Sequence, residues 1–171
     1  MPFAHKIALI IALMFLCSFP VRAELRIAVL DFELNDITLN PRIPEEVERT
    51  ASLKPLLEER LVAEGGYRIV PLAPDAQENA TKSFGYLWDH PDEAAVLGKT
   101  AGAEFVIVGR VNKPSFLFVY FFARLIDVRT QKMIGEFAVE IKGQQKKITP
   151  KGIENLAGQI DAKLQTLRHS Q

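Results

Sequence analysis

Cysteine is almost absent from this sequence: among its 171 residues only Cys17 carries a thiol. Cys17 lies in an apolar segment near the N-terminus, which we expect to be removed, and the large Leu16 before it argues against lipid modification. The rest of the chain can therefore form no disulfide, thiol redox pair or thiolate metal site, and it must fold around an ordinary hydrophobic core.

An excess of one charge is also missing, since 21 basic residues balance 21 acidic ones. This balance gives no electrostatic footprint for nucleic acid.

The usual catalytic motifs are missing as well. The sequence contains no Gly-x-Ser-x-Gly motif and no glycine-rich phosphate loop, and no lysine follows Gly65-Gly66. After residue 23 only His90 and His169 remain as histidines, and neither has a second histidine or a cysteine nearby in the sequence. We interpret His90 as a turn residue before a helix; a hydrolase using His90 with Asp89 or Asp92 is the minor alternative. The sequence predicts a protein that is not an enzyme and that needs no cofactor.

The first 23 residues have the three-part layout of a secretory signal. His5 and Lys6 form a short basic start, and Ile7–Phe19 is an almost unbroken apolar run. Ala23 at the last position and Val21 two residues before it are small enough for a signal peptidase site. The run is short for a membrane span, so an uncleaved anchor is the second interpretation. We therefore predict export, with a signal peptide at residues 1–23 and one domain at residues 24–171.

Hydrophobic periodicity predicts a single α/β (α+β) domain. A strand apolar on both faces is expected first, followed by a helix in which Pro55 causes a kink or a restart capped by Ser52. The expected strands are Leu25–Leu34, Tyr67–Leu72, Glu104–Val111, Phe116–Val128 and Met133–Lys142, and the expected helices are Glu45–Glu64, Pro91 to about Gly98–Gly102, and Pro150–Leu167. The order β-α-β-α-β-β-β-α predicts one mixed β-sheet, parallel at the helical crossovers and antiparallel at the last hairpin.

Four oxygen-bearing side chains follow the first strand: Asp31, Glu33, Asn35 and Asp36. This spacing is similar to the start of a calcium loop, but Asp36 stands where the loop needs glycine and Arg42 where it needs glutamate. We keep Asp31, Asn35 and Asp36, with His90, as candidate ligand or cation residues, and favour a capped turn whose carboxylates face water. Asp31 is also placed to pair with Arg110 if the strands are neighbours.

The segment from Asn112 to Phe122 is the best candidate for recognition. In an extended strand Phe116, Phe118, Tyr120 and Phe122 lie on one face and Leu117, Val119 and Phe121 on the other. Such a strand must be covered on both faces, either as the centre of the core or by a partner protein or a second copy. The predicted partner-binding residues are Asn112, Lys113, Pro114, Ser115, Phe116, Phe118 and Tyr120.

Three stretches, residues 26–33, 102–110 and 123–130, resemble periplasmic domains of the curli-secretion lipoprotein type. The amino-terminal domain of the Tol system's translocation protein and lipoproteins that activate cell-wall synthases share this pattern. In that group one strand begins with Gly-Ala-Asp and a hairpin carries Asp-Val-x-Thr-Gly. Here Glu104 stands in place of the aspartate and Gln131 in place of the turn glycine.

A closer resemblance is to an uncharacterised family of exported bacterial proteins, carried by residues 49–53, 90–92 and 113–119 and covering most of Leu25–Ile160. It implies a periplasmic accessory or assembly protein that binds another envelope protein or itself. The alternative is a small-ligand or cation-binding protein auxiliary to quinoprotein dehydrogenases.

Overall fold

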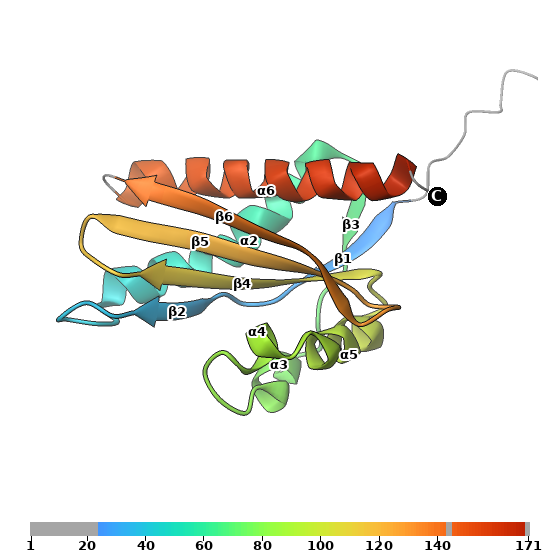
Figure 1. Cartoon of the computed structure of the whole chain (residues 1–171), viewed down its shortest axis with the longest axis horizontal. Coiled ribbons are helices and arrows are strands. Elements are labelled where there is room, and N and C mark those ends of the chain that lie inside the picture. The colour runs from blue at the N-terminus through green and yellow to red at the C-terminus, as the bar shows by residue number, and fades with distance from the viewer. Residues whose placement is uncertain (1–23, 143–144, 170–171) are drawn as a thin grey trace, which may run out of the picture.

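The structure of this chain is a computed structural model that describes residues 24–142 and 145–169, with the side chains of residues 148–169 described in the second range. Six strands form one mixed sheet in the order β3-β1-β4-β5-β6, and β2 pairs with β4 beyond the end of β1 (Figure 1). The strands are β1 (Leu25–Val29), β2 (Glu33–Asp36), β3 (Tyr67–Ile69), β4 (Phe105–Lys113), β5 (Phe118–Asp127) and β6 (Lys132–Lys142). Strands β1, β2 and β3 run parallel to their neighbours and β4-β5-β6 is antiparallel, so the predicted mixed sheet is confirmed. The predicted signal peptide lies outside the described residues.

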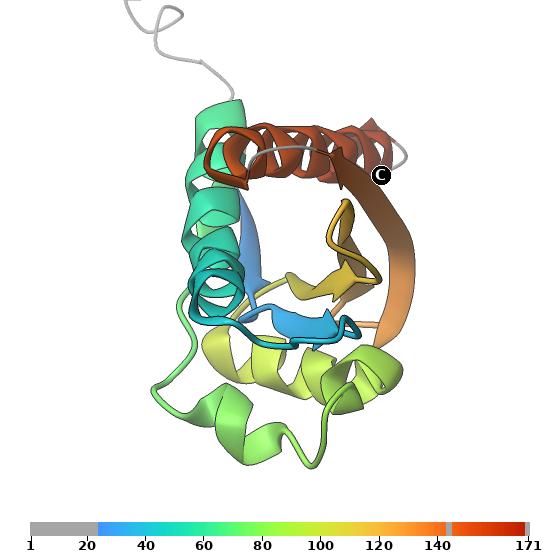
Figure 2. The same cartoon turned by 90° about the vertical axis from the view of Figure 1, so that its left-hand side faces the viewer.

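Two long helices cover one face of the sheet, and three short helices lie on the other (Figure 2). The long ones are α2 (Pro44–Glu64) and α6 (Gln145–His169), and the short ones are α3 (Ala76–Ala80), α4 (Tyr86–Asp89) and α5 (Pro91–Ala101). α2 and α5 match the prediction closely, with Pro91 in the first turn of α5. α6 begins five residues earlier than predicted, and the stretch before Pro91 contains two short helices where only turns were expected. Within the described ranges no helix is long and apolar enough to cross a membrane.

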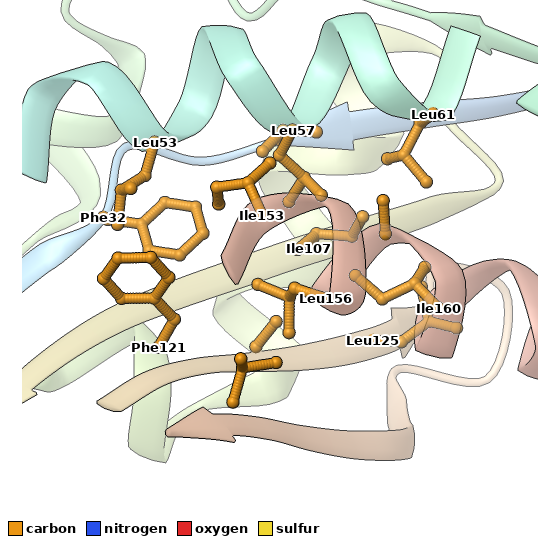
Figure 3. Packing of buried hydrophobic residues seen from close by; sticks show 14 of the residues in the cluster. Phe32, Leu53, Leu57, Leu61, Ile107, Phe121, Leu125, Ile153, Leu156 and Ile160 are labelled. Carbon is orange, nitrogen blue, oxygen red and sulfur yellow. The ribbon is translucent and has the colours of Figure 1, made fainter. Parts of the chain in front are cut away.

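The larger core lies between the sheet and the two long helices (Figure 3). Its fully buried side chains come from α2, from α6 and from three neighbouring strands: Leu53, Leu57, Leu61, Ile153, Leu156, Ile160, Ile27, Ile107, Phe121 and Leu125. Burying each aliphatic side chain of this size contributes about 1.5–3 kcal/mol. The smaller core lies on the other face, where Leu30, Val106 and Leu97 pack together with Trp88.

The predicted first strand, Leu25–Leu34, is divided in two by a bulge. Ile27 pairs with Phe105 but Glu33 pairs with Arg110, so the sequence separation of paired residues falls from 78 to 77. The extra residue, Asp31, is exposed. A bulge changes which side chains face which side of the sheet, so Val29 and Phe32 both point into the larger core. Periodicity alone does not show this change of face, because both faces of this segment are apolar.

The predicted restart of the helix at Pro55 is wrong, because α2 runs from residue 44 to residue 64 without a break. The alternative of a kink stays a prediction. Ser52 does not cap a helix; its hydroxyl donates a hydrogen bond of 2.6 Å to the carbonyl of Arg49. A proline removes the hydrogen bond to the carbonyl four residues earlier, here that of Ala51. Because Ala51 is exposed, water can bind this carbonyl and the helix continues.

Two glycines in helices allow the effect of packing on stability to be tested apart from the effect of helix propensity. A Cβ added at Gly98 in α5 would lie 2.1 Å from a methyl group of Val106, whereas one added at Gly158 in α6 would meet nothing within 4 Å. We expect Gly98→Ala to destabilise the protein by about 1–3 kcal/mol through overpacking. Gly158→Ala, the matched control, should stabilise it by about 0.5–1 kcal/mol. Urea unfolding curves measure both, and equal shifts would contradict the close packing of α5 on β4.

Candidate functional site

A buried lysine organises the loop end of the sheet, where β2 and β4 finish. Lys113, the last residue of β4, is only 3% exposed. Its Nζ lies 3.0 Å from Glu46 Oε1 in the first turn of α2 and 3.6 Å from Asp36 Oδ2 at the end of β2. One ammonium group therefore links three elements that are distant in sequence. Such buried pairs cost a large desolvation free energy, so removing one partner is strongly destabilising.

Arg49 extends this buried charge network along α2. Its guanidinium contacts the carboxylate of Glu46, and both side chains are almost completely buried. Burial lowers the pKa of Arg49, although the Glu46 carboxylate opposes that shift. The hydroxyl of the buried Thr50 donates a hydrogen bond of 2.8 Å to the carbonyl of Glu46. Two carboxylates and two cations thus lie together inside the loop end, and their charges balance.

Asp36 holds the loop between β2 and α2. Its carboxylate accepts hydrogen bonds from the Thr38 hydroxyl at 2.7 Å, from the Thr38 amide at 3.1 Å and from the Arg42 amide at 3.1 Å. Burial alone would raise the pKa of Asp36, but these hydrogen bonds and the charge of Lys113 outweigh it and hold the pKa below its usual value. The loop is therefore folded around an ionised carboxylate.

Above this polar network the loop end presents large apolar side chains to solvent. Ile37 and Leu39 from the β2–α2 loop are 65% and 99% exposed, and Phe116 and Leu117 from the β4–β5 loop are 69% and 74% exposed. We call these four residues the apolar tip. A hydrogen bond of 3.2 Å from the Ile37 amide to the Lys113 carbonyl joins the two loops, which lie at the same end of the sheet (Figure 1). Four large apolar side chains exposed at one end of a small domain are typical of an interaction surface.

The apolar tip continues onto one face of β5. Val119 and Phe121 point into the larger core, whereas Phe122 packs with the smaller one. Alternation places Phe118 and Tyr120 on the same side as Phe122. The three short helices lie away from the loop end of this face (Figure 1), so Phe118 and Tyr120 stay half-exposed. The aromatic strand is thus core on one face and partly open on the other, between the two alternatives that the sequence left.

The predicted pairing of Asp31 with Arg110 is wrong. Arg110 Nη2 lies 3.1 Å from Glu33 Oε2, while Asp31 pairs with Lys54 at 3.2 Å. The bulge is the physical reason, because it moves Asp31 out of the ladder and brings Glu33 opposite Arg110.

Trp88 lies in a cluster that sequence reasoning missed. The guanidinium carbons of Arg110 and Arg124 lie 4.6 Å and 4.2 Å from the Trp88 ring centre. In the sequence Arg110 and Arg124 alternate with apolar residues of their strands. This alternation indicates that the two arginines share a face of the sheet, but it does not show which helix covers that face.

The candidate cation residues are not brought together. Asp31 and Asp36 each pair with a lysine, and the Asn35 amide donates a hydrogen bond of 2.8 Å to Asn112. His90 is exposed before α5, where its ring lies 4.4 Å from that of Tyr86. In the part of the chain that the structure describes, no group of three acidic, histidine or cysteine side chains could hold a metal ion.

Comparison with known proteins places this chain in a family. The model of the family DUF3280, described as "Protein of unknown function (DUF2380)", matches residues 25–160. The match covers most of the chain and confirms the predicted membership of an uncharacterised family. Among curated proteins none matches the sequence.

Solved structures share the fold at low sequence identity. The PelC dodecamer from Paraburkholderia phytofirmans is similar with a TM-score of 0.52 and 16% identity, over 84% of this chain and 89% of that one. The LpoB C-terminal domain from Salmonella enterica has a TM-score of 0.48 and 14% identity, over 78% of this chain and 93% of that one. At 16% identity the likeness to PelC shows the fold alone.

Removing the charge of Lys113 tests the buried network. We expect Lys113→Met to destabilise the protein by about 3–5 kcal/mol, because Asp36 and Glu46 lose a buried cation. Adding Glu46→Gln to this variant should recover part of the loss. The exposed Lys151→Met serves as control and should stay within about 0.5 kcal/mol of wild type. A loss below about 1 kcal/mol for Lys113→Met in urea unfolding would refute the role of the network.

The carboxylate of Asp36 predicts a pH dependence. Its pKa is lower in the folded than in the unfolded chain, so the unfolded chain binds more protons and stability rises with pH. The stabilisation by the Asp36 carboxylate is complete above the pKa of the unfolded chain, about 3.9, and is lost as the pH falls through the pKa of the folded chain. We expect the unfolding free energy of Asp36→Asn to fall less steeply than that of wild type below about pH 4. Urea unfolding curves recorded from below about pH 4 up to neutral pH measure this dependence. Identical slopes of the unfolding free energy against pH in wild type and Asp36→Asn would contradict the prediction.

Proposed function

This chain belongs to the DUF3280 family, and we propose that it is an exported, non-enzymatic accessory protein that binds another envelope protein through the apolar tip and the adjoining face of β5. The single observation that carries the proposal is the exposure of Ile37, Leu39, Phe116 and Leu117 on two loops at one end of the sheet. Export is supported by the signal-like first 23 residues and by the resemblance to exported proteins. The tip includes part of the segment 112–120 that the sequence alone selected for recognition.

The construction of the tip suits docking. The buried Lys113 network and the hydrogen bond from the Ile37 amide to the Lys113 carbonyl connect both loops, so the backbone that carries the exposed side chains is held in place before a partner arrives. Preorganised loops lose less conformational entropy on binding. Ser115 adds to this rigidity, since its hydroxyl accepts hydrogen bonds of 3.3 Å from the amides of Leu117 and Phe118.

Large side chains in such a position are typical binding hot spots. Phe116 lies over the ammonium of Lys113, 5.5 Å from its ring centre, and leaves its other face to solvent. Burying an aromatic or leucine side chain at an interface supplies affinity, while surrounding polar groups such as Asn112 supply orientation. This distribution supports protein binding over the alternative of a small-ligand or cation carrier, because Asp31, Asp36 and Asn35 are already paired with lysines or with Asn112.

Self-association is the second candidate, and the comparison with PelC favours it. That protein of similar fold is a dodecamer. A second copy of this chain could cover the same apolar tip, and the oligomeric state distinguishes the two cases.

Site-specific crosslinking tests the docking function. A photoreactive residue at Leu117 should give a discrete adduct with an envelope protein in cells, because this side chain would lie in the interface. The same residue at Val96, exposed on the distant helix α5, is the control and should give none. Adducts of equal yield at both positions, or none at Leu117, would contradict the proposal.

With the captured protein purified, Phe116→Ser combined with Leu117→Ser should raise the dissociation constant by about tenfold or more. The melting temperature should stay close to that of wild type, because both side chains are exposed in the free protein. Light scattering of the pure chain completes the experiment: an oligomer that this double variant dissociates would assign the tip to a second copy.

A further inference from the structure

The edge of the sheet at β2 lacks a strand neighbour on its outer side. β3 ends at Ile69 and pairs only with Leu25–Ile27, so it does not reach the bulge or β2 (Figure 1). Over the described ranges, β2 pairs with β4 alone. The outer side of the chain from the bulge to Asp36 therefore resembles a sheet edge at which a strand has stopped early.

A side chain already takes the place of a strand at the start of this edge. The Asp31 amide donates a hydrogen bond of 2.7 Å to Gln77 Oε1, and the Asp31 carbonyl accepts one of 3.0 Å from Gln77 Nε2. The side-chain amide of Gln77 thus acts as a peptide group would in a neighbouring strand. It shows that the backbone amide and carbonyl of Asp31 point outward and form a sheet-like pair of hydrogen bonds.

Beyond Asp31 the outward backbone groups have no such partner. The amide of Ile37 donates to the Lys113 carbonyl of β4, and in a strand every second residue points the same way. Asn35 and Glu33 therefore pair with β4, whereas Leu34 and Asp36 direct their amide and carbonyl groups to the outer side. No other described residue forms a hydrogen bond with the outward backbone groups of Leu34.

A hollow of about 350 Å³ lies against this edge. It is bounded by β2, by α2 and by the loop before α4, and its lining includes Leu34, Val47, Ala51 and Phe84. Val47 and Phe84 are exposed although both are large and apolar, so the hollow offers apolar side chains beside unpaired backbone groups. Arg42 also lines it and forms no ion pair with any carboxylate of the described residues.

We propose that the outer edge of β2 binds an extended peptide segment of a partner protein as an additional strand. The peptide backbone pairs with the outward groups of Leu34 and Asp36, beyond the position that Gln77 occupies. Apolar side chains at alternate peptide positions pack on Val47, Ala51 and Phe84, and an acidic side chain or terminal carboxylate meets Arg42. Strand addition of this kind takes its affinity from main-chain hydrogen bonds and its specificity from pockets for alternate side chains.

This binding edge is separate from the apolar tip, so it stands or falls independently of the proposed docking function. The tip offers side chains on loops, whereas the edge offers backbone groups beside a hollow. A partner with a folded domain and an extended tail could occupy both.

The first test selects binders from a phage-displayed library of short random peptides on the purified chain. We expect enrichment of peptides with apolar residues at alternate positions and an acidic residue, and a synthetic copy of the best peptide provides the probe. Val47→Arg should raise its dissociation constant by about tenfold or more, because the new side chain fills the hollow. Val62→Arg is the matched control, since Val62 is an exposed valine of the same helix that does not line the hollow, and it should bind as wild type does.

Amide hydrogen exchange identifies the bonded groups directly. The Leu34 amide should exchange faster than that of Asn35 in the free protein and should slow down when the peptide is saturating. No enrichment over a selection without protein, equal binding by Val47→Arg, or unchanged exchange at Leu34 would each overturn the proposal. The Leu34 amide could instead exchange more slowly as the concentration of the protein alone rises, and show no such change in Val47→Arg. That outcome would overturn the proposal, because the edge of β2 would then bind a second copy of this chain.

Discussion

The buried ammonium group of Lys113 is the constraint on which the loop end of this protein depends. It joins the end of β4 to the end of β2 through Asp36 and to the first turn of α2 through Glu46. A buried ion pair adds little net stability compared with an apolar replacement, but one that loses a partner is strongly unfavourable. An arrangement of the two loops that moved Asp36 away from Lys113 would leave the Asp36 carboxylate without its buried cation. The network therefore favours the loop arrangement of the structure, in which the apolar tip is exposed.

The bulge at Asp31 has a comparable effect on the edge of the sheet. It allows one continuous chain to pair with both ends of β4 while exchanging the faces of the residues on either side. Glu33 is thereby brought to Arg110, and Phe32 enters the larger core. It also turns the Asp31 backbone outward, where Gln77 pairs with it. If the strand alternated regularly without a bulge, Asp31 would lie on the same face as Val29 and point into the larger core, where an unpaired carboxylate is costly.

The main features of the fold could be predicted from the sequence, because most elements carry a clear periodicity. The stripe of Leu53, Leu57 and Leu61 defines α2, and the alternation around Phe137 defines β6. The bulge could not be predicted, because both faces of the first strand are apolar and a change of face leaves no signal. Pro55 indicated a break that the exposure of Ala51 makes unnecessary.

The candidate site was predictable in part. The aromatic residues between Asn112 and Tyr120 predicted a recognition segment, and this segment contributes Phe116 to the apolar tip. Its partners Ile37 and Leu39 were not selected, since isolated apolar residues in a polar loop are ordinary in sequence. The buried charges of α2 did leave a signal. Continuing the stripe of Leu53 by one and two turns toward the N-terminus reaches Thr50, Arg49 and Glu46, so polar residues were placed at core positions.

That placement supports the proposed role of the loop end in recognition. A core position filled with leucine would bury the loop end against α2 and tolerate several loop conformations, because apolar contacts are not directional. Charges at the same positions require defined partners at defined distances, and they hold the β2–α2 and β4–β5 loops against one another. The apolar side chains of the tip are then free to remain outside, since the stability of the loops does not depend on burying them. A surface that is apolar, exposed and already ordered in the free protein combines two properties that favour binding: apolar area to bury and little conformational entropy to lose.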